Sequence, residues 1–360
     1  MSAAEIGNPV QPVEPGLRAE HRDSLLAVRG LRKTYTTGGG GLLGGERRTV
    51  RAVDGVSFDV ARGETFGLVG ESGCGKSTVA RCVLHLINPT EGEIRFDGVD
   101  LGSLGHDELR KLRRRMQIVF QDPFTSLDPR MTAYSIVDEP LGIHGVHDRE
   151  ERERRVEEML DLVGITPEQM DRRPFAFSGG QRQRIGLARA LVLNPDLVVL
   201  DEPVSALDVS IQAQVLNLLR DLQARLGLTY LFIVHDLTIA EYFCDRLAVL
   251  YLGAVMELGD RETLFRAPLH PYTNALLSAV PLPDPRRERR RKRIIIKGEA
   301  SPQSGAVQGC RFRPRCPVGQ DRDICRQSEP PLQEKAPGHW AACHFAGELP
   351  TGWEAGAEKS

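Results

Sequence analysis

An α/β fold built on a parallel sheet is predicted by three observations. Short apolar runs alternate with stretches of helical periodicity between about residues 66 and 234. The run from Leu197 to Leu200 is apolar throughout, as expected for a strand that is buried on both faces. A glycine-rich loop follows one such run at residue 70, and polar side chains follow two others at residues 201 and 235, which is where α/β sheets place their functional sites. We therefore expect a doubly wound sheet with its chemistry at one edge.

Composition limits the classes of protein that this sequence can encode. The chain has 360 residues, enough for one large domain with an appendage or for two domains. Its net charge of −2 argues against a generally basic protein that coats nucleic acid. No apolar run approaches the roughly 20 residues that span a bilayer. The first residues lack a basic start and an apolar segment, so we expect no secretory signal and a cytosolic chain.

The N-terminal part is expected to form an antiparallel β region. Residues 1–24 are rich in Pro, Glu and Ala without periodicity and are interpreted as a disordered leader. The alternation over residues 53–60 indicates a strand, with Asp54-Gly55 marking a turn beside it. The glycine-dense residues 38–45 suggest a flexible hairpin tip, and residues 93–98 an edge strand with its turn.

The strongest motif in the chain is a phosphate-binding loop at residues 70–78. It fits the pattern G-x-x-x-x-G-K-[ST], with an apolar run before it and helical periodicity after it. Glycines let such a loop turn its amide hydrogens inward, and the N-terminus of the following helix favours anions. Lys76 is expected to reach the phosphates and Ser77 to bind Mg²⁺. The nucleotide-binding residues of the loop are predicted to be Gly70, Ser72, Gly73, Cys74, Gly75, Lys76, Ser77 and Thr78.

Two further patterns carry chemistry. A second glycine-bearing helix start forms a second candidate anion site and comprises Ser178, Gly179, Gly180 and Gln181. Asp201 and Glu202 end a buried strand as adjacent carboxylates, which repel each other unless a cation lies nearby. A metal site is therefore favoured at that strand end.

Taken in order, these motifs resemble the nucleotide-binding domains of ABC transporters. The phosphate loop, Gln121, the segment 177–181, the strand ending at Glu202, Asp208 and His235 follow one another as they do in that family. Phe177 replaces the more usual Leu, which we expect to matter little because both are apolar. The resemblance implies a P-loop NTPase fold with a parallel sheet core, an antiparallel β subdomain and a helical subdomain at about residues 123–180.

The resemblance also implies a role for each motif residue. Asp201, Ser77 and Gln121 are expected to hold Mg²⁺, Glu202 to act as general base, and His235 to contact the γ-phosphate. Tyr35 matches the aromatic residue that stacks on adenine in this family. The 178–181 turn is expected to bind ATP held by a partner subunit in a head-to-tail dimer, with Asp208 at the seam.

The C-terminal part narrows the resemblance to oligopeptide and dipeptide importers. The segments 267–273, 297–299 and 309–317 resemble the region that follows the ATPase core in those proteins. Four cysteines crowd this part of the chain: Cys310, Cys316, Cys325 and Cys343. Their spacing matches neither a zinc ribbon nor a ferredoxin run. The family resemblance implies a [4Fe–4S] cluster, while Zn²⁺ and merely packed thiols are the alternatives.

These expectations define an ATPase subunit of a peptide importer. The expected domains are a leader (1–24), an ATPase domain (25–266), a C-terminal region with the four cysteines (267–346) and a tail (347–360). The expected cofactors are ATP and Mg²⁺. Expected partners are a second, related ATPase chain, two membrane permeases and an extracytoplasmic solute-binding protein, with no nucleic acid. The chain should lie peripherally on the cytoplasmic face of the plasma membrane.

The basic stretch 286–293 suggests a solvated linker, or else contact with anionic lipid or nucleic acid.

Rival interpretations remain open at this point. The same ATPase type also serves importers of nickel chelates or other small solutes. A non-transport ABC ATPase of DNA repair or translation is less favoured, because no long coiled coil and no second ATPase unit is present in the sequence. A binding module without hydrolysis is disfavoured by the presence of Lys76, Asp201, Glu202 and His235.

Overall fold

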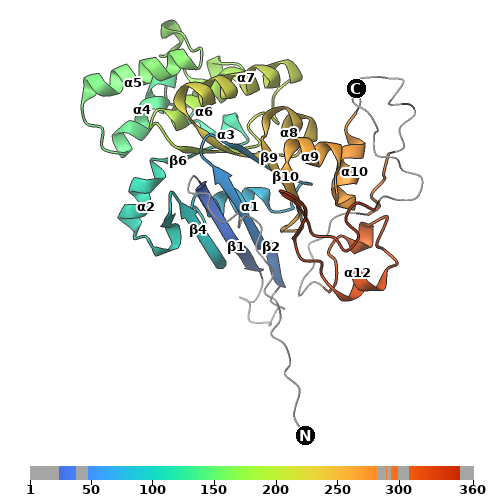
Figure 1. The fold of residues 1–360 in the computed structure, drawn as a ribbon. Helices are drawn as coiled ribbons and strands as arrows, with labels where there is room; N and C mark the ends of the chain where they lie inside the picture. The colour runs from blue at the N-terminus through green and yellow to red at the C-terminus, as the bar shows by residue number, and fades with distance from the viewer. Residues whose placement is uncertain (1–23, 38–47, 282–288, 290–292, 299–307, 349–360) are drawn as a thin grey trace, which may run out of the picture.

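Two β-sheets with one helix between them organise the protein (Figure 1). The computed structural model describes residues 24–37, 48–281, 289, 293–298 and 308–348. The expected leader up to residue 23, the glycine-dense insert, most of the basic stretch and the tail from residue 349 lie outside these residues. No helix within the described ranges is long and apolar enough to cross a membrane.

The larger sheet has the strand order β11-β12-β10-β9-β3-β8-β7-β6. Its five strands from β9 to β6 are parallel, and the three strands at the other end pair antiparallel. The strands are β3 (Thr65–Val69), β6 (Met116–Val119), β7 (Leu197–Asp201), β8 (Thr229–Val234), β9 (Arg246–Tyr251), β10 (Ala254–Asp260), β11 (Gln333–Ala336) and β12 (His339–Ala341). The predicted parallel α/β core is confirmed.

Alternate side chains of the central strands enter two different cores. In β7, Val198 and Leu200 pack into one core, and Leu197 and Val199 into the other. Both faces are covered because every residue of β7 is buried. This two-sided burial is the reason why the run is apolar throughout rather than alternating.

The smaller sheet is antiparallel, with the order β2-β1-β4-β5. Its strands are β1 (Ser24–Thr37), β2 (Arg48–Ala61), β4 (Glu91–Phe96) and β5 (Val99–Asp100). Helix α1 (Lys76–Val83) contacts β1 and β2 of this sheet and β7 and β8 of the larger one, and so joins the two sheets.

Two local predictions in this sheet are wrong. Asp54-Gly55 is not a turn: β2 runs on through it, with a register shift against β1 at this point, so the residues form an irregularity inside one strand. The strand predicted at residues 93–98 is not at the edge. β4 lies between β1 and β5, because the Asp97-Gly98 turn leads directly into a further strand.

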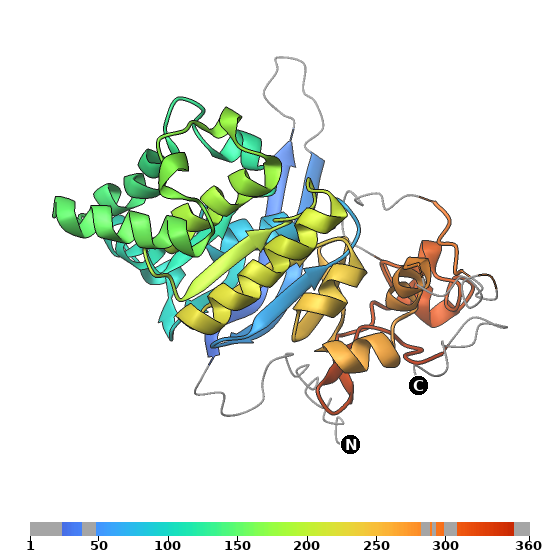
Figure 2. The ribbon, with the colours of Figure 1, turned by 90° about the horizontal axis from the view of Figure 1, so that it is seen from above.

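The helices between β6 and β7 form a lobe on one side of the larger sheet, drawn in green in Figures 1 and 2. Val156 and Leu160 of this lobe are fully buried and share a core with β7 and β8. The helices of the first three-quarters of the chain include α2 (His106–Arg113), α3 (Pro123–Ser126), α4 (Ala133–Ile143), α5 (Arg149–Leu162), α6 (Gly179–Leu191), α7 (Val209–Leu226) and α8 (Leu237–Phe243), with 3-10 turns at Leu101–Ser103, Pro167–Gln169 and Pro174–Ala176.

The C-terminal region lies on the other side of the core, in orange and red in both views. It contains α9 (Arg261–Arg266), α10 (Pro271–Ala279), a 3-10 turn (Arg313–Arg315) and α12 (Asp323–Gln327). Its strand β12 pairs with β10, so this region extends the larger sheet rather than standing apart from it.

Candidate functional site

The phosphate loop connects β3 to α1, as its sequence context predicts. Gly75 caps α1 with φ 108°, and a Cβ atom there would lie 2.3 Å from the Ala52 carbonyl oxygen. Lys76 is buried, and its Nζ donates hydrogen bonds to the carbonyl oxygens of Gly70 (2.8 Å) and Glu71 (3.1 Å). The lysine is thus held against the first turn of the loop.

Cys74, inside the loop, is a packed thiol. It is buried, and burial raises the pKa of the thiol above its usual value. A thiol with a raised pKa holds its proton at neutral pH and reacts slowly.

The loop meets the end of β7 through Ser77. The Ser77 hydroxyl donates a hydrogen bond to Asp201 Oδ1 at 3.0 Å. Asp201 is buried, and burial, with a smaller contribution from the charge of Glu202, raises the pKa of its carboxyl. A buried carboxylate beside a hydroxyl provides the oxygen ligands that Mg²⁺ prefers. The fold therefore brings together two of the three predicted magnesium residues, which lie 124 positions apart.

The third predicted magnesium residue and the predicted histidine converge on Glu202. Gln121 Nε2 donates to Glu202 Oε2 at 3.0 Å, and His235 Nδ1 lies 3.1 Å from the same oxygen. The two side chains follow β6 and β8, the strands on either side of β7. The ends of three neighbouring strands thus supply one cluster.

Glu202 has a backbone conformation that is rare for a non-glycine residue. Its φ is 48°, in the left-handed region. Its backbone N–H donates to the Ile233 carbonyl, and its own carbonyl accepts from the backbone N–H and the hydroxyl of Ser205. A small cavity beside it is lined by Ser205, His235 and Asp236, among others. Such outliers gather at functional sites, where the surrounding structure holds them in place.

The second glycine turn begins α6. Ser178 is the N-cap: its hydroxyl accepts from Gln181 N–H, and the Gln181 side chain accepts from Ser178 N–H in return. Phe177, the departure from the family pattern, is buried and apolar as expected. Gly180 has a packing role that the motif does not reveal, because a Cβ atom there would lie 2.5 Å from the Ile211 side chain.

Tyr35 and Asp208 are among the predicted site residues that are exposed. Tyr35 is 40% exposed, with Lys33 Nζ 5.3 Å from the centre of its ring. Asp208 is exposed at the N-cap of α7, and the next residue, Val209, is 81% exposed.

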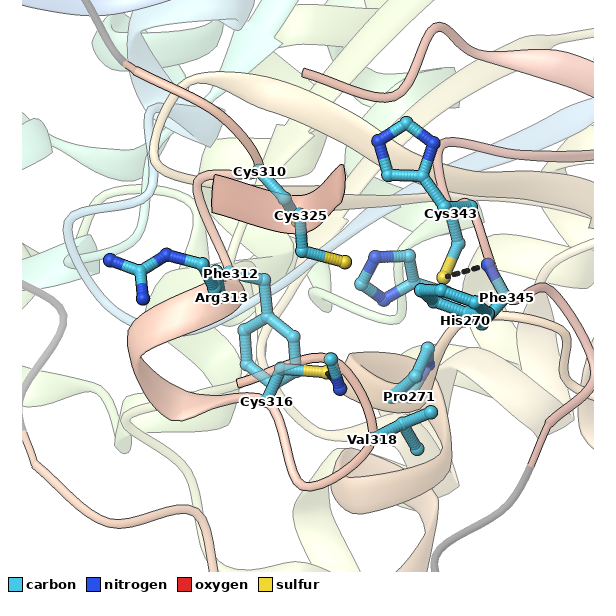
Figure 3. A pocket seen from close by; sticks show the side chains of 12 residues that line it. His270, Pro271, Cys310, Phe312, Arg313, Cys316, Val318, Cys325, Cys343 and Phe345 are labelled. Atoms are coloured by element: carbon cyan, nitrogen blue, oxygen red, sulfur yellow. Dashed lines mark hydrogen bonds between the residues drawn. The ribbon is translucent and has the colours of Figure 1, made fainter. Parts of the chain in front are cut away.

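The four C-terminal cysteines lie around one cavity. Figure 3 shows the sulfurs of Cys316, Cys325 and Cys343 directed toward a common space beside Phe312 and His270. All four thiols are buried and free, and all four line this cavity. Burial raises the pKa of Cys310 to about 11 and that of Cys343 to about 12. Within the described part of the chain, no three His, Cys, Asp or Glu side chains are placed to hold a single metal ion.

One histidine of this region is buried against a carboxylate. His339 is buried, and its Nε2 lies 2.7 Å from Oε1 of the fully buried Glu257. Glu257 also accepts hydrogen bonds from the backbone N–H groups of Leu269 (2.7 Å) and His270 (2.9 Å). A buried carboxylate needs such partners, and here they come from segments far apart in the sequence.

Two arginines near Cys310 and Cys316 make contacts that the sequence does not predict. Arg315 binds Glu71 of the phosphate loop, and Arg311 binds Asp54 and Glu329. Charged residues in a loop sequence indicate solvent exposure, and no periodicity pairs residues 244 positions apart.

Comparisons with known proteins show the family of this chain. Residues 53–205 match the family model described as ABC transporter, and residues 256–325 match the one described as oligopeptide/dipeptide transporter, C-terminal region. A putative peptide import ATP-binding protein of Brucella ovis is 54% identical over 89% of this chain and 97% of its own. The oligopeptide transport ATP-binding protein AppF of Bacillus subtilis is 50% identical over 91% and 99%.

Solved structures give the same result for the core. A dimeric ATP-binding cassette in a post-hydrolysis state, bound to ADP and Pi, is 32% identical, with a TM-score of 0.58 over 66% of this chain and 98% of its own. The protein cbiO1 of Clostridium perfringens, part of the ABC transporter complex cbiONQ, is 29% identical, with a TM-score of 0.59 over 68% and 91%.

Proposed function

This chain belongs to the ATP-binding subunits of oligopeptide and dipeptide ABC transporters, and from that membership we propose how its residues serve the transport cycle. It is an ATPase that works as a dimer of ATPase subunits on membrane permeases. The roles of individual residues are our proposal.

Hydrolysis is assigned to Glu202. A water oxygen attacks the γ-phosphorus of ATP, the bond to the β-phosphate oxygen breaks, and Glu202 accepts the proton of the water. The observation that carries this assignment is the convergence of Gln121 and His235 on Glu202 Oε2, at 3.0 and 3.1 Å. These contacts fix the direction of the carboxylate. Ser77, Asp201 and Gln121 would hold Mg²⁺, which offsets the charge of the phosphates.

Nucleotide binding is assigned to the phosphate loop, Tyr35 and, from the second subunit, the 178–181 turn. The N-terminus of α6 offers backbone N–H groups and partial positive charge to an anion. The exposure of Asp208 and Val209 beside this turn supports a dimer seam there. A related but different ATPase chain is proposed as the partner.

Replacement of Glu202 tests the assignment. We expect Glu202→Gln to bind ATP with an affinity close to that of the unchanged protein and to hydrolyse it slower by a factor of about 10² to 10⁴, because the amide cannot accept the proton. Turnover and equilibrium binding are measured on the same preparation. Lys76→Ala serves as the contrasting variant, in which binding itself is lost. Turnover near that of the unchanged protein in Glu202→Gln would overturn the assigned base.

Peptides are the proposed cargo. The named relatives are peptide import or oligopeptide transport ATP-binding proteins, and the C-terminal match is to the same group. We propose that an extracytoplasmic binding protein delivers the peptide and that this chain sits on the cytoplasmic face of the plasma membrane. Uptake assays with labelled di- and oligopeptides, compared with nickel chelates, test the choice. Loss of nickel uptake alone in a Glu202→Gln strain would contradict it.

The four cysteines are proposed to hold a [4Fe–4S] cluster, which would serve as a structural staple for this region. Three observations support this proposal. The thiols surround one cavity, and Gly319 N–H and Phe345 N–H donate hydrogen bonds to Cys316 Sγ and Cys343 Sγ. His270 Nδ1 accepts from Tyr272 N–H, and its buried Nε2 makes no hydrogen bond of normal geometry, only a weaker contact with the Ala342 backbone.

The choice of a cluster over a single zinc ion is part of this proposal and rests on the resemblance of the C-terminal region to that of peptide importers. Anaerobic purification tests this point. We expect brown protein with equal amounts of iron and acid-labile sulfide, and loss of both in Cys316→Ser. Colourless protein that contains zinc would contradict the cluster.

A further inference from the structure

The C-terminal region contacts the phosphate loop directly, through an ion pair. Arg315 Nη1 and Nη2 bind the two carboxylate oxygens of Glu71 at 2.8 and 3.0 Å, a two-pronged ion pair. The Arg315 side chain is only 10% exposed, and its guanidinium also lies near the ring and hydroxyl of Tyr251. Paired planar geometry of this kind fixes both position and orientation.

A second contact holds the same loop residue by its backbone. Glu71 N–H donates to the hydroxyl of Tyr272 at 3.1 Å, and Tyr272 is fully buried. Phe312 packs against both Tyr251 and Tyr272, with ring centres 5.3 Å apart in each pair. The arginine and the tyrosine that hold Glu71 are therefore parts of one packed unit.

The same stretch also reaches the other flank of the loop. The nearly buried Arg311 donates to the Leu252 carbonyl and pairs with Asp54. Gly253, next to Leu252, donates from its N–H to the Cys74 carbonyl and accepts from Asp54 N–H. Arg315 thus contacts the phosphate loop itself, at Glu71. Arg311 contacts Leu252 and Asp54, which lie against the other side of the loop.

Two consequences follow for an incoming triphosphate. Glu71 puts a negative charge into a loop that binds anions, and Arg315 neutralises that charge. The carbonyl of Glu71 also accepts a hydrogen bond from Lys76 Nζ, so the position of Glu71 bears on the lysine that is assigned to the phosphates. Fixing Glu71 keeps the loop in the shape that its ligand needs.

We propose that Arg315 is a positioning residue for ATP, through which the cysteine-rich C-terminal region holds the phosphate loop by its Glu71 side chain. ATP affinity then depends on a segment that touches neither the nucleotide nor the catalytic carboxylate. The proposal does not require a particular metal on the cysteines.

The split between KM and kcat tests this role. In the assembled transporter that contains the full chain, Arg315→Met should raise the KM for ATP about tenfold and leave kcat within about twofold. Calorimetry with ATP on the full chain should show the same loss of affinity. A matched control is Arg322→Met, which removes the Arg322–Glu348 pair (2.9 Å) and the contact of Arg322 with the Phe345 ring in the same region, and should change neither constant.

Glu71→Ala separates positioning from charge. Removing a carboxylate beside a triphosphate would by itself tighten ATP binding, so a rise in KM can come only from a loop that is no longer held. We expect a rise of about threefold, and no further loss when Glu71→Ala is added to Arg315→Met. Glu71 is partly exposed, so this variant decides the question even if Arg315→Met does not fold.

Three results would overturn the proposal. The first is an unchanged or lower KM in Glu71→Ala. The second is an unchanged KM in folded Arg315→Met. The third is an equal rise in KM in Arg322→Met, which would show that any damage to the region has this effect.

Discussion

Asp201 and Glu202 are adjacent in sequence but occupy different environments. Asp201 is buried with Ser77 as a hydrogen-bond donor, whereas Glu202 is turned by its left-handed φ toward Gln121 and His235. The backbone twist at Glu202 thus lets two neighbouring carboxylates serve different purposes. Strain at such a residue costs about 1–3 kcal/mol, which the surrounding fold must offset.

The raised pKa of Asp201 implies that its ionised form destabilises the metal-free protein at neutral pH. We expect Asp201→Asn to raise the free energy of unfolding at pH 7 without Mg²⁺, and to abolish turnover. Chemical unfolding at several pH values checks this. The asparagine can still accept the hydrogen bond from Ser77.

The sign of the pH dependence follows from the direction of the shift. The folded protein keeps the Asp201 proton to a higher pH than the unfolded chain does, so the unchanged protein loses stability as pH rises between the two pKa values. Below the unfolded pKa the carboxyl is neutral in both states, and the advantage of Asp201→Asn should disappear. A variant that is less stable at pH 7 would refute this account.

At the scale of elements, the strand–loop–helix unit depends on close contact with β2. The Ala52 carbonyl lies where a Cβ atom of residue 75 would be, and Gly75 has φ 108°, so both space and backbone require glycine. The antiparallel sheet therefore supports the nucleotide-binding loop, because its strand β2 packs against Gly75. This contact explains why two sheets with different strand directions form one site.

Gly75→Ala should destabilise the protein by about 2–4 kcal/mol and weaken ATP binding more than tenfold, because the loop must move away from β2. Thermal unfolding and ATP titration measure the two effects. Gly186→Ala is the matched control: this helical glycine has nothing within 4 Å of the added Cβ, so stability should be unchanged or slightly higher. Equal losses in both variants would contradict the steric argument.

At the scale of the whole molecule, the predicted boundary at residues 266 and 267 does not separate the structure into two parts. The larger sheet continues across it through β12, and Glu257 of β10 is surrounded by donors from residues 269, 270 and 339. Arg311 and Arg315 add ion pairs to Asp54 and Glu71. The C-terminal region is therefore packed into the ATPase core, which makes communication between them physically direct.

Much of the fold could be predicted because its signals are local. The strand, glycine loop and helix around Lys76, the apolar strand ending at Asp201, and the capping box at Ser178 each depend on residues within a few positions of one another. Strand β11 escaped prediction because its short sequence is polar and every residue of it is exposed, and β12 because three residues are too few to show a pattern.

The sequence by itself determined which chemical groups this protein has and in what order, since phosphate loops, helix caps and buried strands are written in short-range patterns. Only the tertiary structure decided which of those groups meet. Ser77 reaches Asp201, Gln121 and His235 reach one oxygen of Glu202, and Arg315 reaches Glu71. The order of the strands and the packing of distant segments decide these pairs. Hydrophobic burial assembles those segments, and because it is non-directional, the sequence alone does not specify which residues become partners.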